Sequence, residues 1–257
     1  TQTKHEYFGS AGKLNKIPVL IHESDYTPGL ANRIAVKFAS KMFVTFPEAK
    51  KHLPKEKVMV TGSPIREELL AGDRKRGLSF LDFHENKPVI TVMGGSLGSA
   101  KLNAVIRDNL DILLKNYQIV HLCGKGNLDE SLMKRRGYQQ FEYLSSELPD
   151  VVAATDFVVS RAGSNSIFEW LELKKPMLLI PLSKAASRGD QILNAQSFKK
   201  QGFAEVLEEE ELTDESFLQS IHKLNQHRQQ YIEAMNTKAS SNGLGTILDE
   251  IEQAASK

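Results

Sequence analysis

The chain has 257 residues, and at about 100–200 residues per domain this length predicts one long or two modest domains. Lys and Arg total 33 and Asp and Glu total 32, so the net charge of +1 argues against a strongly basic nucleic-acid binder and an acidic disordered tail. The single cysteine, Cys123, excludes a disulfide framework and a cysteine-based zinc site, and it is typical of a cytosolic protein. No apolar run approaches the ~20 residues of a membrane span.

The first 66 residues alternate short apolar runs with amphipathic stretches. The run IPVLIH predicts a buried strand over 17–22, and apolar residues at helical spacing predict a helix over 29–39. Two further short strands are predicted over 42–46 and 58–61. Three strands and one clear helix are few for a doubly wound sheet, so we expect this N-terminal domain to be truncated.

A stretch rich in charge and turn formers, 67–87, predicts a boundary between a domain over 1–66 and a second over 67–257. Beyond it, apolar strands separated by helices indicate an α/β fold with a parallel sheet covered on both faces. Strands are predicted over 89–93, 118–123, 141–144, 157–160, 177–181 and 204–207, and helices over 101–114, 128–136, 151–155, 166–173 and 191–201.

The last part of the chain is more polar. The acidic run over 208–211 is interpreted as a solvated turn. Thr213, followed by two acidic residues, predicts the N-cap of a long helical tail that runs towards Lys257.

Ligands of doubly wound sheets bind where the strands end and lead into helices. The first such loop is GGSLGS, Gly94–Ser99, and its glycines let the backbone approach an anion at a helix N-terminus. The loop is neither the GxGxxG of dinucleotide-binding proteins nor a P-loop. We therefore expect phosphate binding, with an empty tight turn as the alternative.

The second loop, Ser160–Ser166, is another turn of small polar residues that opens a helix. Glu169 lies one turn inside that helix, where a carboxylate can accept hydrogen bonds from two adjacent ribose hydroxyls. The alternative is an acidic residue that only favours the helix N-terminus.

The third loop, 183–194, carries Asp190, Gln191 and Asn194, which suit the hydroxyls of a sugar. The alternative is an ordinary helix start with Asp190 as its cap. No cluster of metal ligands accompanies these loops, so no metal site and no cofactor are predicted.

Two residues of the first domain are candidates for chemistry. His22 ends the predicted strand over 17–22 and has acidic neighbours, so it could act as a general base, although a loop histidine without a role is the more common case. Arg66 closes the segment GSPIR and could contact a phosphate. His121 and Cys123 are interpreted as packed core residues.

Five segments in order resemble the MurG family of N-acetylglucosamine (GlcNAc) transferases. They are HESDYTPGLAN, GSPIR, GGSLGS, SRAGSNSIFE and SRGDQILNA, and their spellings are similar to those of Gram-positive, Bacillus-type members. The resemblance runs from about Lys16 to the C-terminus. It implies the GT-B architecture, in which two Rossmann-like doubly wound domains face a cleft.

The resemblance also implies roles for individual residues. The backbone of Leu144 matches the position that reads uracil, Glu169 matches the ribose-binding glutamate, and Arg66 matches an arginine that approaches the phosphates. The diphosphate site corresponds to Ser96, Ser164, Asn165 and Ser166, and the GlcNAc contacts to Asp190, Gln191 and Asn194. Many members carry Gln where this chain has Leu97 and Asp190.

The activity that the resemblance implies is inverting transfer of GlcNAc from UDP-GlcNAc to the C4 hydroxyl of lipid I. Lipid I is undecaprenyl-pyrophosphoryl-MurNAc-pentapeptide, and the product is lipid II of peptidoglycan synthesis. The polyprenyl tail of the acceptor implies peripheral association with the cytoplasmic face of the cell membrane. No nucleic acid is expected as a partner.

Family members open with a Gly-rich loop that ends in a histidine, and residues 1–12 do not match it. That segment is implicated in acceptor binding and base catalysis, so we expect this chain to bind the donor better than it catalyses. Two alternatives remain: a donor-binding role without turnover, and another UDP-sugar reaction such as UDP-GlcNAc 2-epimerisation.

Overall fold

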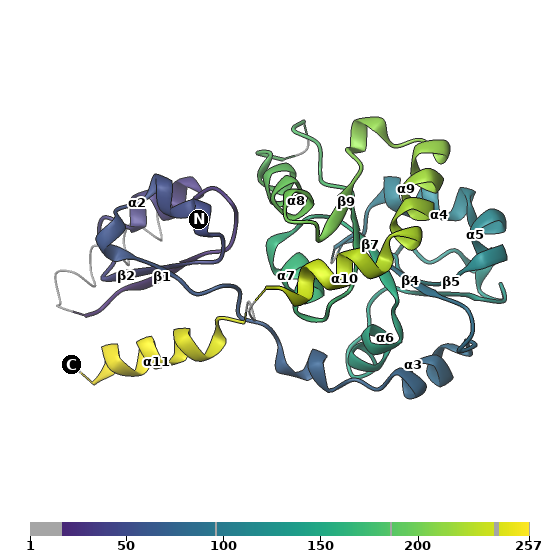
Figure 1. The fold of residues 1–257 in the computed structure, drawn as a ribbon, viewed down its shortest axis with the longest axis horizontal. Helices are drawn as coiled ribbons and strands as arrows, with labels where there is room; N and C mark the ends of the chain where they lie inside the picture. The colour runs from purple at the N-terminus through teal and green to yellow at the C-terminus, as the bar shows by residue number, and fades with distance from the viewer. Residues whose placement is uncertain (1–16, 96, 186, 239–241, 257) are drawn as a thin grey trace. The chain divides into compact units, whose positions relative to one another are not determined.

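The computed structural model describes residues 17–95, 97–185, 187–238 and 242–256 (Figure 1). Contacts divide the chain into two compact units, Thr1–Ile65 with Ser164–Phe168 and Ala239–Lys257, and Arg66–Gly163 with Glu169–Lys238. The contacts thus group the C-terminal helix α11, Leu244–Ala255, with the first unit. The sequence-based division assigns it to the second domain, and that division stays a prediction.

The first unit holds a three-stranded parallel sheet in the order β1-β2-β3. Its core is a cluster of apolar side chains on β2 and its neighbours, among them Met42, Val44 and Val58. Helix α2 is shorter than the predicted 29–39: it begins at Leu30 and ends at Ala35, with Val36 as its C-cap. The elements are β1 (Leu20–Glu23), α2 (Leu30–Ala35), β2 (Lys41–Val44), η1 (Pro47–His52), η2 (Lys55–Lys57) and β3 (Val58–Val60).

The second unit is built on a six-stranded parallel sheet in the order β6-β5-β4-β7-β8-β9. This is the doubly wound order 3-2-1-4-5-6, in which successive strands are added first to one side and then to the other side of the first strand, so the strand order reverses between β4 and β7. The predicted parallel α/β sheet is therefore confirmed. The strands are β4 (Val89–Met93), β5 (Gln118–Leu122), β6 (Tyr138–Phe141), β7 (Phe157–Ser160), β8 (Met177–Leu179) and β9 (Ala204–Val206).

Helices cover both faces of this sheet, and Figure 1 shows α6 and α3 on one side and α4, α5 and α9 on the other. One face packs on α3 and α6 through a cluster that includes Leu78, Leu81 and Val151. The helices are η3 (Glu67–Ala71), α3 (Arg74–Leu81), α4 (Ala100–Asp108), α5 (Leu110–Asn116), η4 (Glu130–Leu132), α6 (Leu148–Ala154), α7 (Ser164–Glu172), α8 (Asp190–Lys200), η5 (Glu209–Glu211), α9 (Asp214–Gln226) and α10 (Arg228–Asn236).

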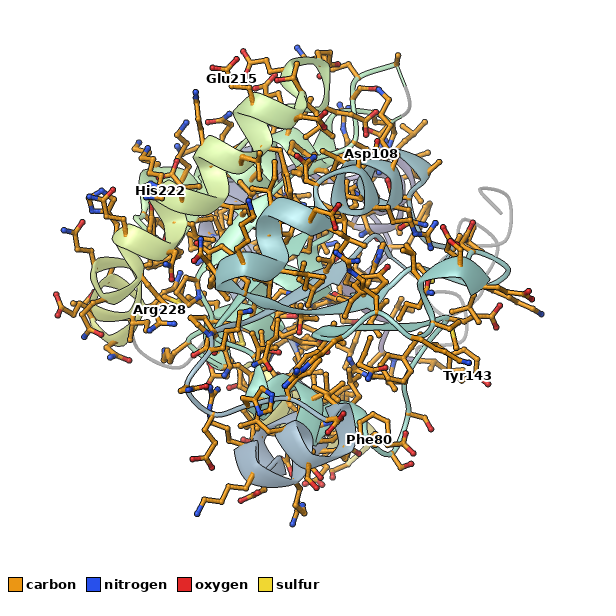
Figure 2. The ribbon with its side chains drawn as sticks, turned by 90° about the vertical axis from the view of Figure 1, so that its right-hand side faces the viewer. Phe80, Asp108, Tyr143, Glu215, His222 and Arg228 are labelled. Atoms are coloured by element: carbon orange, nitrogen blue, oxygen red, sulfur yellow. The ribbon has the colours of Figure 1, made fainter. Side chains whose placement is uncertain are left out.

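The polar C-terminal part is three helices rather than one long tail. Thr213 caps α9, as predicted, and forms a capping box with Ser216. Figure 2 shows Glu215 and His222 on the outer side of α9, while the opposite stripe of that helix is buried in the unit. No helix among the described residues is both long and apolar enough to cross a membrane.

Candidate functional site

Two loops of the second unit begin at neighbouring strand ends. Met93, the last residue of β4, pairs in register with Ser160, the last residue of β7. The chain then runs from β4 through the Gly-rich loop into α4, and from β7 directly into α7. Because the strand order reverses between β4 and β7, their carboxyl ends are where a doubly wound sheet binds its ligand.

The glycines of the first loop are required by its backbone. Gly95 has φ +96° and Gly98 has φ +75°, a region that other residues rarely adopt. A Cβ at Gly98 would lie 2.0 Å from the carbonyl oxygen of Cys123, whereas a Cβ at Gly95 would meet nothing within 4 Å. The loop therefore packs backbone to backbone against the end of β5 and stays open at Gly95. Ser96, a predicted diphosphate contact, lies outside the described residues.

The structure brings two predicted site residues together. Nε of Arg66 lies 2.8 Å from Oε1 of Glu169, and its Nη2 lies 3.1 Å from Oε2, so the pair is bidentate. The hydrogen bond to Glu169 raises the pKa of the Arg66 guanidinium above its ordinary value. The side chain of Arg66 is 57% exposed and that of Glu169 is 15% exposed. A ligand at this position can therefore reach the pair from solvent.

A small apolar pocket lies beside this ion pair. It is lined by residues from η3, β4, α6 and α7, including Leu69, Met93 and Trp170 along with Arg66 and Glu169. The indole N–H of Trp170 is buried and has no hydrogen-bond partner among the residues that the structure describes. The pocket thus joins the charged pair to the carboxyl end of β4.

Helix α7 begins with the predicted residues Ser164, Asn165 and Ser166. Its N-cap is Gly163, which has no side chain, so no side-chain hydrogen bond caps the first N–H groups of the helix. Asn165 is exposed, and the buried hydroxyl of Ser166 has no partner among the described residues. Such a helix start is suited to an anion.

Among the other predicted donor contacts, two side-chain amides are engaged within the protein. Leu144 follows β6, and its side chain packs on the core cluster around Leu78. Oε1 of Gln191 accepts the N–H of Leu182 at 3.1 Å, and the fully buried Asn194 donates to the carbonyl of Ala162 at 3.2 Å. The amides of Gln191 and Asn194 thus brace the loops that follow β8 and β7.

Asp190 is not the cap of α8. Gly189, with φ +85°, is the N-cap, and Asp190 is the first helical residue. Its carboxylate pairs with Arg188, whose Nη2 lies 2.8 Å away. The capping interpretation of Asp190 is therefore wrong, because the left-handed glycine turns the chain into the helix one residue earlier.

In the first unit, His22 lies on β1, and its Nε2 is 3.2 Å from the hydroxyl of Thr45. Burial lowers the pKa of the imidazole below its ordinary value, against the hydrogen bond to the Gly62 backbone and the charge of Glu23, which raise it. Glu23 itself is buried and accepts the N–H of Gly29 at 2.9 Å. The turn that follows β1 is thus held by a carboxylate, and the histidine favours its neutral form.

The sequence does not predict a buried ion pair beside the Gly-rich loop. Arg161 and Glu209 contact each other with exposed side-chain fractions of only 9% and 7%, and Lys101 lies 3.0 Å from the same carboxylate. The interpretation of 208–211 as a solvated turn is therefore wrong for Glu209. No local sequence signal marks this pair, because its two cations come from α4 and from the residue after β7.

His121 is packed in the core, as predicted. It lies between the hydroxyl of Tyr138, at 2.8 Å, and Oδ1 of Asn103, at 2.9 Å. Cys123 is likewise buried.

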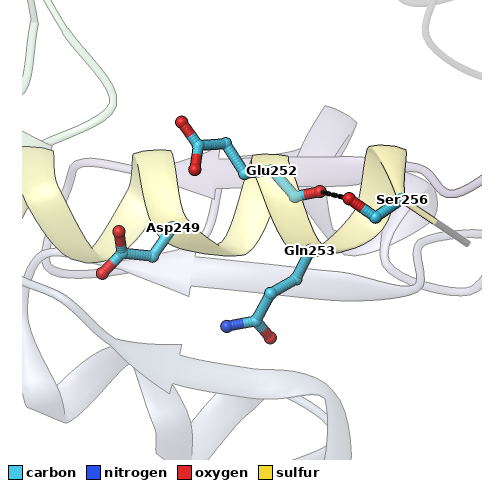
Figure 3. Close-up of a pocket in the computed structure, with 4 residues that line it drawn as sticks. All are labelled: Asp249, Glu252, Gln253 and Ser256. Carbon is cyan, nitrogen blue, oxygen red and sulfur yellow. Dashed lines mark hydrogen bonds between the residues drawn. The ribbon is translucent and has the colours of Figure 1, made fainter.

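A second hollow lies on the first unit along α11 (Figure 3). Its lining residues are polar, and the hydroxyl of Ser256 donates to the carbonyl of Glu252 at 2.9 Å. None of the predicted site residues lines it: its lining is Asp249, Glu252, Gln253 and Ser256.

Comparison with known proteins decides the family. Residues 89–251 match the model of the glycosyltransferase family 28 C-terminal domain. A Bacillus cereus "UDP-N-acetylglucosamine--N-acetylmuramyl-(pentapeptide) pyrophosphoryl-undecaprenol N-acetylglucosamine transferase 2" is 62% identical over 243 residues, 95% of this chain and 69% of the relative. The chain belongs to the MurG family of glycosyltransferases. A Geobacillus thermodenitrificans transferase of the same description is 54% identical over 94% of this MurG-family chain and 68% of its own length.

Solved structures agree on the fold of this MurG-family chain. Acinetobacter baumannii MurG superposes with a TM-score of 0.73 at 22% identity, over 95% of this chain and 69% of that one. A Neisseria meningitidis UDP-GlcNAc 2-epimerase bound to UDP-GlcNAc gives a TM-score of 0.67 at 15% identity, over 96% of this chain and 71% of that one. At these identities the likeness shows the shared GT-B fold alone.

Proposed function

We propose that this glycosyltransferase moves GlcNAc from UDP-GlcNAc to the C4 hydroxyl of lipid I, which gives lipid II, with UDP as the other product. The observation that carries the proposal is the high identity to GlcNAc transferases of this description. The two small-residue loops at the strand-order reversal, with Glu169 one turn into α7, support it.

The donor half of the reaction follows from charge. The bond from the anomeric carbon to the diphosphate breaks, and negative charge grows on the departing UDP. The first turns of α4 and α7 present N–H groups and the positive ends of their dipoles, which stabilise that charge in the transition state. Glu169 would accept the two ribose hydroxyls, and Arg66 would move from Glu169 to a phosphate.

The acceptor half needs a base for the C4 hydroxyl proton. His22 is the candidate in this chain, because burial keeps its imidazole neutral and therefore able to take a proton. Its hydrogen bond with Thr45 would fix the ring orientation.

The acceptor carries a polyprenyl tail, so the reaction would take place at a lipid surface. We propose peripheral association with the cytoplasmic face of the cell membrane, since the donor is a nucleotide sugar and the acceptor is membrane-bound.

The test is transfer of radiolabelled GlcNAc from UDP-GlcNAc to a lipid I analogue, with the Bacillus cereus relative as the positive control. We expect a lipid-linked disaccharide from both proteins, with slower formation by this chain than by the relative. Donor binding without product would overturn the proposal in favour of a donor-binding role. Isomerised UDP-sugar in the absence of lipid I would favour an epimerase.

A further inference from the structure

A single buried arginine links three elements around the Gly-rich loop. Arg161 directly follows β7, and its Nη1 donates to the carbonyls of Ile180, at 3.0 Å, and Pro181, at 3.3 Å, just beyond β8. Its Nη2 donates to the hydroxyl of Ser99 at 2.7 Å. One guanidinium therefore connects the ends of two strands to the residue that precedes α4.

Ser99 is the N-cap of α4, and its hydroxyl also accepts the N–H of Leu102 at 3.4 Å. The orientation of this side chain therefore sets how the Gly-rich loop joins the helix. The N–H groups of that first turn are the ones expected to face the diphosphate.

Glu209 holds the arginine in place. It comes from η5, far along the chain from the loop, and its carboxylate contacts both Arg161 and Lys101. Burial opposes its charge, but Lys101 and Arg161 together lower the pKa of the Glu209 carboxyl below its ordinary value. A desolvated guanidinium without a counter-ion is costly, so Arg161 would turn towards solvent if Glu209 lost its charge.

We propose that Glu209 and Arg161 are positioning residues for the donor diphosphate, which act by fixing Ser99 and the first turn of α4. Neither residue needs to touch the donor for this. The inference rests on the proposed function, because it assigns these residues to the UDP site.

Two other roles give different outcomes. If Glu209 acted only through its charge, its removal would tighten UDP binding, because an anion near the diphosphate would be gone. If the pair only stabilised the fold, substitution of Glu209 would weaken the binding of UDP and of uridine alike. Uridine lacks the diphosphate but uses the rest of the site. Positioning predicts a loss that is confined to the diphosphate.

The experiment is isothermal titration of UDP and of uridine into the wild-type chain, Glu209→Gln and Glu210→Gln. Glu210 is exposed on the same short helix and serves as the matched control. We expect Glu209→Gln to lower UDP affinity about tenfold, which corresponds to about 1.4 kcal/mol. Uridine affinity and both affinities of Glu210→Gln stay at the wild-type values.

Unchanged or tighter UDP binding in Glu209→Gln, or an equal loss for UDP and uridine, would overturn the inference. Should that variant fail to fold, Arg161→Lys replaces it: a lysine keeps the charge opposite Glu209 but cannot also serve Ser99 and Ile180 with a fork of donors. We expect the same loss of UDP affinity without a loss of uridine affinity, and unchanged UDP binding would count against the proposal. A wild-type chain that binds no UDP would instead remove the proposed function itself.

Discussion

Arg66 and Glu169 form a bidentate ion pair, in which Nε donates to Oε1 at 2.8 Å and Nη2 donates to Oε2 at 3.1 Å. Both residues are predicted to contact the donor, one at a phosphate and the other at the ribose. While they are paired with each other, neither can make its donor contact fully. Donor binding therefore has to exchange this ion pair for two separate contacts.

Substitution of Arg66 tests this exchange, because it should affect the binding of UDP and of uridine differently. Arg66→Ala removes a phosphate contact, so we expect weaker UDP binding. It also frees Glu169, so uridine should bind as well as before or up to a few fold more tightly, since an exposed ion pair is worth about 0–1 kcal/mol. Titration of both ligands decides. A parallel loss of UDP and uridine would show that Arg66 does not compete for Glu169.

Glu169→Gln tests the ribose assignment. The carboxylate is expected to accept two charge-assisted hydrogen bonds, so UDP affinity should fall by more than about 1 kcal/mol. The loss should shrink when 2′-deoxy-UDP is the ligand, because one of the two partners is then absent. Glu172→Gln, on the same helix, is the control. An equal loss for UDP and 2′-deoxy-UDP would refute a contact with the 2′-hydroxyl.

Two glycines with nearly the same φ angle distinguish the cost of backbone strain from the cost of steric crowding. Gly98 has φ +75° and Gly126 has φ +76°, but only at Gly98 would a Cβ collide, 2.0 Å from the Cys123 carbonyl. We expect Gly126→Ala to cost about 1–2 kcal/mol of unfolding free energy, the price of a left-handed alanine. Gly98→Ala should cost clearly more. Urea unfolding measures both, and equal costs would mean that the loop readily moves away from β5.

His121 should make stability depend on pH. Burial holds its pKa at about 3, mainly because the charged imidazole would be desolvated in the core. The unfolded chain takes up this proton below pH 6.5 and the folded chain does not, so stability is full above pH 6.5 and falls as the pH drops towards 3. At pH 5 the loss is about 2 kcal/mol.

Urea unfolding at pH 7.5 and pH 5 measures this loss. His121→Gln should show a smaller difference between the two pH values, while His222→Gln, an exposed control visible in Figure 2, should behave like the wild-type chain. A wild-type difference that survives in His121→Gln would assign the proton to another group.

The sheet of the second unit could be predicted because its strands are apolar throughout, as strands covered on both faces must be. The points at which helices break could not be predicted from the sequence. The predicted helix over 101–114 divides at Asn109, whose side-chain amide donates to Val105 and to Asp214, both at 2.8 Å. That second partner lies far away in sequence, so no local pattern reports it.

The predicted helix over 128–136 is wrong for a related reason. Only Glu130–Leu132 forms a short 3-10 turn, because Gln140 of β6 binds the backbone of Asp129 through both ends of its amide. Glu209 was missed because an acidic run is usually solvated, and its two cations come from α4 and the end of β7. Sequence identifies the loops of the site, but the long-range pairs that brace them depend on the tertiary fold.

The most direct test of the donor site is a crystal structure of the chain with UDP-GlcNAc. The diphosphate should lie within hydrogen-bonding distance of the first N–H groups of α4, with both ribose hydroxyls on Glu169 and Arg66 withdrawn from that carboxylate. A nucleotide bound elsewhere, or a ribose that leaves the ion pair of Arg66 and Glu169 intact, would contradict this site.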